Sequence, residues 1–173
     1  MRILITGAFG QLGFALNDVL SDKFDVIRTG RVIPSGLKGI GLNIQDKIYL
    51  NEVIAATSPD LIINLAAMTN VDACERNPEI AKEVNIAGFQ HICDSFKGKI
   101  IQLSTDYVFD GKNGPYKEDD PVCPISVYGK TKLASEKLIF EHSSDNLVIR
   151  GNVLYCLLYT SDAADDTPCL DLG

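Results

Sequence analysis

The chain has 173 residues, a formal net charge of −7, 46% hydrophobic residues, 5 cysteines and no tryptophan. This length suits one α/β domain, and a negative charge without a basic cluster argues against a nucleic acid or an anionic membrane as partner. No apolar run approaches the roughly 20 residues of a membrane span, and the first residues form a strand pattern rather than a signal peptide. The cysteine spacing fits neither a disulfide framework nor a zinc site. We therefore expect a cytoplasmic protein with reduced thiols and no metal.

Strand and helix patterns alternate in chain order. The apolar spacing predicts a strand at 2–6, a helix over 12–20, a strand at 24–28, a Gly- and Pro-rich loop at 30–41, a helix from 46 to about 58, a buried strand at 61–65, a helix from 77 to about 96, a buried strand at 99–103, a helix over 127–140 and a strand from 146. This alternation predicts βαβ units, and hence a doubly wound parallel sheet of the Rossmann type with strand order 3-2-1-4-5-6.

The alternation ends at Tyr155. Residues 156–173 (CLLYTSDAADDTPCLDLG) contain four aspartates and neither lysine nor arginine. The transposon-end DNA TGTCTCTTATACACATCT, used in sequencing-library preparation, translates as Cys156–Ser161, so this stretch resembles translated sequencing adapter. A native acidic, disordered tail is the alternative. We predict a dinucleotide-binding domain over 1–155, with net charge −7 + 4 = −3, and a non-native tail over 156–173.

A glycine loop, Gly7-x-x-Gly10-x-x-Gly13, joins the first strand to the first helix. In this setting Gly7 permits a tight turn, Gly10 lets the backbone approach a pyrophosphate, and Gly13 lets the helix pack against the strand. The helix N-terminus would then hold the negative charge. A plain glycine-rich connector is the alternative, but the position after the first strand favours a dinucleotide site.

The end of the second strand bears on the choice of cofactor. NAD sites usually place a carboxylate there for the ribose 2′-hydroxyl, whereas this strand ends in Arg28-Thr29-Gly30-Arg31. Either Arg28 or Arg31 could pair with a 2′-phosphate through its guanidinium fork, although both could equally be solvated surface arginines. The sequence therefore favours NADP(H) over NAD(H).

Tyr128 and Lys132 lie four residues apart at the start of a predicted helix, so they share one helix face. A nearby ammonium favours the phenolate, which predicts a lowered pKa for Tyr128 and a role as general acid or base. Thr105, at the end of the fifth predicted strand, could hydrogen-bond the same carbonyl oxygen. A surface lysine beside an amphipathic tyrosine is the alternative.

Several segments together resemble the dTDP-4-dehydrorhamnose reductase family, in the extended branch of the short-chain dehydrogenases/reductases. They are LITGAFGQLG, NLAAMTNVDACERNPE, VNIAG, STDYVFDGKNGPYKEDDPVCPISVYGKTKLASEK and IRGNVLY, and they cover essentially all of 1–155. The resemblance implies NAD(P)H-dependent reduction of the C4 ketone of dTDP-4-dehydro-L-rhamnose to dTDP-L-rhamnose. Tyr107 stands where related dehydratases carry an acidic residue, which favours carbonyl reduction.

Site roles follow from the same resemblance. Tyr128 would give a proton to the C4 oxygen, Lys132 would lower the pKa of Tyr128 and hold the nicotinamide ribose, and Thr105 would orient the ketone, with Asp106 near the sugar. Thr29 stands where many members have aspartate, which weakens NAD specificity. The resemblance also implies three groups of cofactor-binding residues. The pyrophosphate would lie against Gly10, Gln11, Leu12 and Gly13, and the adenine would lie near Asn43 and Ile44. The cofactor cleft would be lined by Ala67, Met68 and Thr69.

The resemblance also implies that the C-terminal substrate domain of this family is missing beyond Tyr155, so the fragment itself is expected to be inactive. For the complete protein it allows a homodimer. A rival interpretation is a regulatory module like the β subunit of methionine adenosyltransferase, which shares the STDYVFDG and YGKTK regions and would bind NADP without turnover. A third interpretation is a non-catalytic dinucleotide-binding domain, which the presence of both Tyr128 and Lys132 disfavours.

Overall fold

The protein, described by a computed structural model over residues 1–143 and 145–152, is built on one parallel sheet. Within these residues six strands pair in the order β3-β2-β1-β4-β5-β6, and every pair is parallel. The predicted strand order and doubly wound class are therefore confirmed. The strands are β1 (Arg2–Thr6), β2 (Asp25–Gly30), β3 (Ile40–Gly41), β4 (Leu61–Asn64), β5 (Lys99–Thr105) and β6 (Leu147–Gly151).

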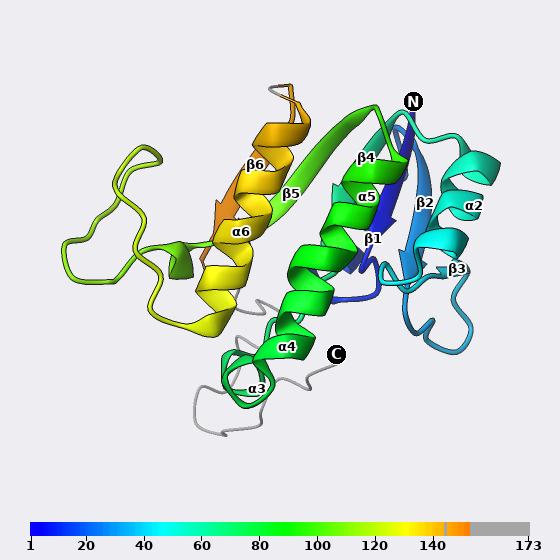
Figure 1. The fold of residues 1–173 in the computed structure, drawn as a ribbon. Coiled ribbons are helices and arrows are strands. Elements are labelled where there is room, and N and C mark those ends of the chain that lie inside the picture. Colours follow the sequence, from blue (N-terminus) through cyan, green and yellow to red (C-terminus); the bar gives the residue numbers. More distant parts are fainter. Residues whose placement is uncertain (144, 153–173) are drawn as a thin grey trace, which may run out of the picture.

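Helices cover both faces of this sheet. The helices α2, α5 and α6 lie together over one face (Figure 1), and the apolar side chains of α1 pack on the other. Their bounds are α1 (Gln11–Leu20), α2 (Lys47–Thr57), α3 (Val71–Arg76), α4 (Pro78–Lys82), α5 (Phe89–Ser95) and α6 (Val127–His142), with a π turn η1 (Glu83–Gly88) and a 3₁₀ turn η2 (Asp106–Val108). None of these helices has the length and apolar character that a membrane crossing requires.

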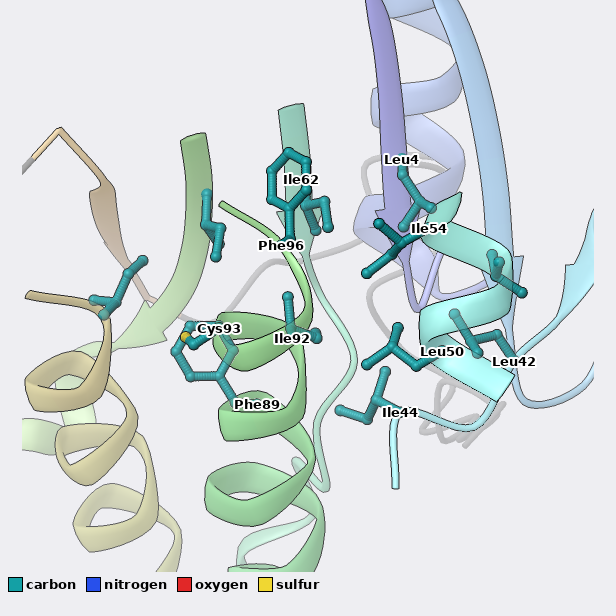
Figure 2. Packing of buried hydrophobic residues seen from close by; sticks show 13 residues of the cluster. Leu4, Leu42, Ile44, Leu50, Ile54, Ile62, Phe89, Ile92, Cys93 and Phe96 are labelled. Carbon is teal, nitrogen blue, oxygen red and sulfur yellow. The ribbon is translucent and has the colours of Figure 1, made fainter. Parts of the chain in front are cut away.

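The core is divided between the two faces because side chains of a strand alternate. In β1, Leu4 points into the larger cluster, where side chains of α2 and α5 pack together (Figure 2), while Ile3 and Ile5 belong to the smaller cluster with Leu16 of α1. Burial of each such side chain contributes about 1.5–3 kcal/mol. This packing holds the strand ends, and the segments that follow them, in fixed positions.

Three local features differ from the predicted pattern. The predicted loop at 30–41 ends in β3, α3 was not predicted, and the predicted helix over 77–96 is divided into α4, η1 and α5. Helix α3 has only six residues and begins where Asn70 Oδ1 accepts from the Ala73 amide at 2.8 Å, so it is too short for a periodic signal. The predicted residues 153–155 of the last strand and the predicted tail 156–173 lie outside the described residues.

A row of buried polar side chains crosses the sheet. Thr6, Asn64 and Gln102 are register partners on β1, β4 and β5. The Thr6 hydroxyl donates to Asn64 Oδ1, Asn64 Nδ2 donates to Gln102 Oε1 at 2.7 Å, and Gln102 Nε2 donates to Ser135 Oγ at 3.4 Å. Ser135 in turn donates to the Lys132 carbonyl at 2.8 Å. This polar row ties the sheet to the turn of α6 that carries Lys132.

Candidate functional site

The carboxyl ends of β1, β4 and β5 lie side by side because these parallel strands are neighbours. The glycine loop follows β1, the segment 65–70 follows β4, and η2 follows β5. The strand order reverses between β1 and β4, and ligands of open α/β sheets bind outside the strand ends at such a point. The predicted functional segments therefore meet at one edge of the sheet.

Two glycines make the glycine loop tight. Gly7 has φ +64°, and a Cβ there would lie 2.8 Å from the Ala66 amide nitrogen, so the loops after β1 and β4 touch through bare backbone. A Cβ on Gly13 would lie 2.6 Å from the backbone of Ala8. Helix α1 can therefore begin directly against the end of β1, as the sequence predicted.

The N-terminus of α1 presents free backbone donors. Gly10 is its N-cap, and no side chain caps this end or adds an acidic group to the first turn. The amides of Gln11, Leu12 and Gly13 thus have no intrahelical acceptor. Together with the helix dipole they fit the pyrophosphate of a dinucleotide, which is the group the sequence analysis assigned to them.

Phe9, within the same loop, packs against the end of β2. Its ring centroid lies 5.5 Å from the guanidinium carbon of Arg28, and a Cβ on Gly30 or Gly39 would lie 2.8 or 2.4 Å from ring atoms. Arg28 and Lys38 both line a surface pocket of about 310 Å³. The structure thus brings two cations together at the end of the sheet where the sequence placed the adenosine half of the cofactor.

Thr29 does not face this region. Its side chain is buried, and its hydroxyl donates to the Ile5 carbonyl at 3.0 Å. The weakened NAD specificity inferred for this position stays a prediction, because it concerns the missing carboxylate and not the buried Thr29 hydroxyl. Arg28, which contacts Phe9, and the exposed Arg31 remain the candidates at this strand end.

Asn43 and Ile44, predicted near the adenine, follow β3. Asn43 is exposed, and its Oδ1 accepts from the Gln45 amide at 3.1 Å. Ile44 is 3% exposed and belongs to the larger core cluster. Its carbonyl oxygen lies 3.2 Å from Nδ1 of His91. The Ile44 side chain thus packs in the core, which leaves its backbone as the part that could meet a ligand.

The segment 67–69 after β4 is held by a residue that the sequence analysis did not single out. Asn85 Oδ1 accepts from the Met68 amide at 2.7 Å, and Asn85 Nδ2 donates to the Met68 carbonyl at 3.1 Å and to Thr131 Oγ1 at 2.9 Å. Thr131 donates to the Tyr128 carbonyl at 2.8 Å. Asn85 lies in the π turn η1, and its bonds join the predicted cofactor cleft to the turn that carries Tyr128.

The start of α6 is fixed from three sides. The Gly129 amide donates to the Ser126 side chain at 3.0 Å, and the Val127 amide donates to Glu75 Oε1 of α3 at 2.6 Å. A Cβ on Gly129 would lie 2.2 Å from the Tyr107 carbonyl oxygen, so η2 and α6 are in backbone contact there. Neither Glu75 nor Gly129 was predicted, since nothing in their sequence spacing shows which segments meet.

Thr105, Asp106 and Tyr128 come together where β5 ends. Thr105 Oγ1 donates to Asp106 Oδ1 at 3.1 Å and accepts from the Tyr107 amide at 3.2 Å. The Thr105 side chain is also close enough to Tyr128 to act on its phenol and lower its pKa. The rings of Tyr107 and Tyr128 pack edge to face with centroids 5.8 Å apart. The structure thus brings Thr105, Asp106 and Tyr128 together, and the catalytic roles assigned to them stay a prediction.

The electrostatics of Tyr128 differ from the prediction. Burial raises its pKa above the ordinary value near 10, with smaller contributions from Cys74, Asp106 and Tyr107, while the Thr105 side chain opposes them. The predicted lowering of this pKa is therefore wrong, because the effect of burial is the largest and the net shift is upward. Because a phenol with a raised pKa keeps its proton at neutral pH, Tyr128 is in the form that a proton donor needs.

Lys132 is 4% exposed. Desolvation lowers its pKa from 10.5 to about 8, and the carboxylate of Glu136 opposes this shift. At pH 7 the side chain is therefore still mainly an ammonium, one turn from Tyr128 and directed into the protein rather than to solvent.

The other reactive side chains offer no second site within residues 1–143 and 145–152. No group of three or more His, Cys, Asp or Glu side chains there could hold a metal ion. Burial raises the pKa of the Cys74 thiol, and it raises the pKa of Cys93 to about 12, so both are inert thiols at neutral pH.

Comparisons with known proteins match this geometry. The family model for the RmlD substrate binding domain matches residues 1–162. The dTDP-4-dehydrorhamnose reductase of Aggregatibacter actinomycetemcomitans is 39% identical over 153 residues, which are 86% of this chain and 50% of the relative. Methionine adenosyltransferase 2 subunit beta of Danio rerio is 35% identical over 158 residues, 89% of this chain and 48% of the relative.

Among solved structures, dTDP-4-dehydrorhamnose reductase of Bacillus anthracis in complex with NADP superposes with a TM-score of 0.80 at 30% identity, covering 89% of this chain and 54% of that one. The chain thus spans about half the length of the relatives it matches. Since the family match covers most of the chain and the strand order, glycine loop and Thr105–Tyr128 contact agree with it, the chain belongs to the RmlD substrate binding domain family.

Proposed function

We propose that this chain is the cofactor-binding part of an NAD(P)H-dependent reductase that converts dTDP-4-dehydro-L-rhamnose to dTDP-L-rhamnose. The observation that carries the proposal is the meeting of Thr105 and Tyr128 at the end of β5, one helical turn from the buried Lys132 and beside the glycine loop at the same sheet edge. Relatives named dTDP-4-dehydrorhamnose reductase supply the substrate class.

A nicotinamide cofactor held by the glycine loop and Lys132 would supply the hydride for C4. Tyr128 gives its phenolic proton to the C4 oxygen, so the ketone gains a hydride and a proton and becomes an alcohol. Thr105 orients the ketone through its hydroxyl, and Asp106 contacts the sugar. Lys132 holds a positive charge beside the phenolate that forms and binds the nicotinamide ribose. General acid catalysis of this kind contributes roughly 10²- to 10⁴-fold to the rate.

For the cofactor we propose NADP(H) in preference to NAD(H). Arg28, oriented by the Phe9 ring, and the exposed Arg31 are suited to a 2′-phosphate, and Lys38 adds a third cation beside the same pocket. Calorimetric titration should give a lower Kd for NADPH than for NADH, and the double variant Arg28→Ala, Arg31→Ala should abolish the difference. Equal affinities in the unaltered protein would rule out this preference.

We further propose that residues 1–155 are the dinucleotide-binding domain of a longer polypeptide and that 156–173 is not native sequence. Leu147 and Ile149 on β6 are 47% and 46% exposed, although Val148 between them packs on the core cluster. Two adjacent apolar side chains on one sheet face are expected to be covered in the complete protein. Resequencing the gene from its source DNA tests this, since an open frame encoding CLLYTSDAADD would disprove it.

The test of the reduction uses the complete polypeptide with NADPH and dTDP-4-dehydro-L-rhamnose, followed by the loss of NADPH absorbance. Tyr128→Phe should lower kcat by roughly 10²- to 10⁴-fold. Tyr49→Phe is the matched control, because Tyr49 is exposed on α2 and should leave kcat unchanged. Reduction by Tyr128→Phe at the unaltered rate would refute the assigned chemistry.

A second candidate is a regulatory subunit that binds NADP without turnover, favoured by the similarity to methionine adenosyltransferase 2 subunit beta. Both candidates share the cofactor site, so binding alone does not separate them. Stable co-purification with a synthetase subunit, together with no NADPH oxidation by the complete polypeptide, would select the regulator.

A further inference from the structure

A buried carboxylate lies one helical turn beyond Lys132. Glu136 is 3% exposed and accepts from Ser104 Oγ at 2.5 Å. It also accepts from Arg150 Nε at 3.0 Å and from Arg150 Nη2 at 2.7 Å, so both carboxylate oxygens are engaged. Buried ion pairs contribute little net stability compared with well-packed apolar residues, so folding alone does not account for a charge at this position.

Arg150 also holds the segment that connects β5 to α6, residues 106–126. Its Nη1 donates to the Glu118 carbonyl at 2.9 Å, and its guanidinium lies 5.2 Å from the centroid of the Phe109 ring. Phe109 stacks on Tyr116 with centroids 4.4 Å apart. The segment 106–126 begins with Asp106 and Tyr107 beside Tyr128, so one guanidinium ties Glu136 to the connection that lines the candidate site.

Lys132 and Glu136 are both buried and lie four residues apart on one face of α6, and the Glu136 carboxylate acts to raise the pKa of Lys132. The other titratable groups that meet this end of α6 come from two neighbouring elements and from α6 itself: Cys74 and Glu75 on α3, Asp106 and Tyr107 on η2, and Tyr128. The polar side chains that β5 and η1 direct toward this end of α6 include the uncharged Ser104, Thr105 and Asn85.

We propose that Glu136 and Arg150 are positioning residues for the reduction: Glu136 keeps the buried Lys132 side chain an ammonium, and Arg150 neutralises Glu136 while fixing the 106–126 connection beside Tyr128. This inference rests on the proposed function for its catalytic meaning. Its electrostatic content is separate, because removal of the carboxylate and removal of the guanidinium should shift the titration of Lys132 in opposite directions. General structural damage would not produce opposite shifts.

The direct test is an NMR pH titration of the Lys132 ε-methylene signal in the chain itself, assigned with Lys132→Met. Glu136→Gln should move the Lys132 titration to lower pH by about one unit, and Arg150→Met should move it to higher pH. The matched controls are Glu141→Gln and Lys137→Met, which make the same charge changes at exposed positions of α6 and should leave it in place. Shifts in the same direction, or no larger than the controls, would overturn the proposal.

Arg150→Lys keeps the positive charge but loses the pair of hydrogen bonds that the guanidinium donates to Glu136. It should leave the Lys132 titration nearly unchanged while increasing hydrogen exchange in 106–126, and unchanged exchange there would overturn the role given to Arg150. In the complete polypeptide, the pH at which kcat/KM falls on the alkaline side should shift in each variant in the same direction as the Lys132 titration. An alkaline pH dependence that does not shift in this way would overturn the positioning role. If no variant or parent reduces the sugar, the proposed function fails, while the opposite NMR shifts still decide the electrostatic inference.

Discussion

Gly129→Ala tests whether backbone contact between η2 and α6 sets the position of Tyr128. The new Cβ would lie 2.2 Å from the Tyr107 carbonyl oxygen, whereas ordinary contacts begin at 3.4 Å, so the two segments must separate by about 1.2 Å. Such overpacking typically costs about 1–3 kcal/mol, and the higher helix propensity of alanine returns up to about 1 kcal/mol. We expect a net loss of about 1–2 kcal/mol in the free energy of unfolding.

The measurement is urea unfolding of Gly129→Ala against the parent chain, with unchanged m-value as the condition for comparison. Gly41→Ala is the control, because no atom lies within 4 Å of a Cβ built there. In the complete polypeptide, NADPH affinity should be kept, since the glycine loop is untouched, while kcat falls because Tyr128 moves relative to Thr105. Equal or greater stability of Gly129→Ala would show that the Tyr107 contact does not constrain α6.

Three further changes have defined outcomes. Asn85→Ala removes three hydrogen bonds and should lower the free energy of unfolding by about 2–4 kcal/mol in urea titrations, with Asn51→Ala, exposed on α2, as a neutral control. The pKa of Lys132 is lowered to about 8 in the folded protein, so between about pH 8 and 10.5 the unfolded chain binds one more proton than the folded one. The free energy of unfolding, measured in urea relative to that of Lys132→Met, should therefore rise by about 3 kcal/mol across that range. A constant difference would contradict the lowered pKa. Phe9→Leu removes the ring that contacts Arg28 and should weaken NADPH binding about 2- to 10-fold in fluorescence titrations, with less effect on NADH.

The sheet order could be predicted because alternating apolar runs and helical spacing leave few topologies for a parallel sheet. The positions of Thr105, Tyr128 and Lys132 could be predicted because Thr105 ends a buried strand while Tyr128 and Lys132 lie at the start of a helix. Their pKa shifts could not, since spacing gives no measure of burial. The bond between Glu136 and Arg150 lies beyond sequence reasoning as well. It forms because β6 pairs with β5 in a register that sets Arg150 beside Ser104, which no local pattern reveals.

The Asn85 contacts illustrate the same limit. The sequence around this residue predicts an ordinary amphipathic helix, whereas the structure contains a π turn whose asparagine reaches both Met68 and Thr131. Such turns are set by tertiary contacts, here including the close approach of Gly88 to Ile44, with a Cβ 2.9 Å from the isoleucine side chain. Positions of this kind are found from a three-dimensional structure.

The row of Thr6, Asn64 and Gln102 across the sheet has a consequence for how the strands find one another. Each amide has its partner only when Asn64 stands opposite Gln102 and Thr6 opposite Asn64. The flanking isoleucines and leucines could pack almost equally well if a strand were displaced by two positions, because apolar contacts are non-directional. The displaced sheet would leave several amide groups buried without partners, so these three polar residues favour the native strand register over displaced ones.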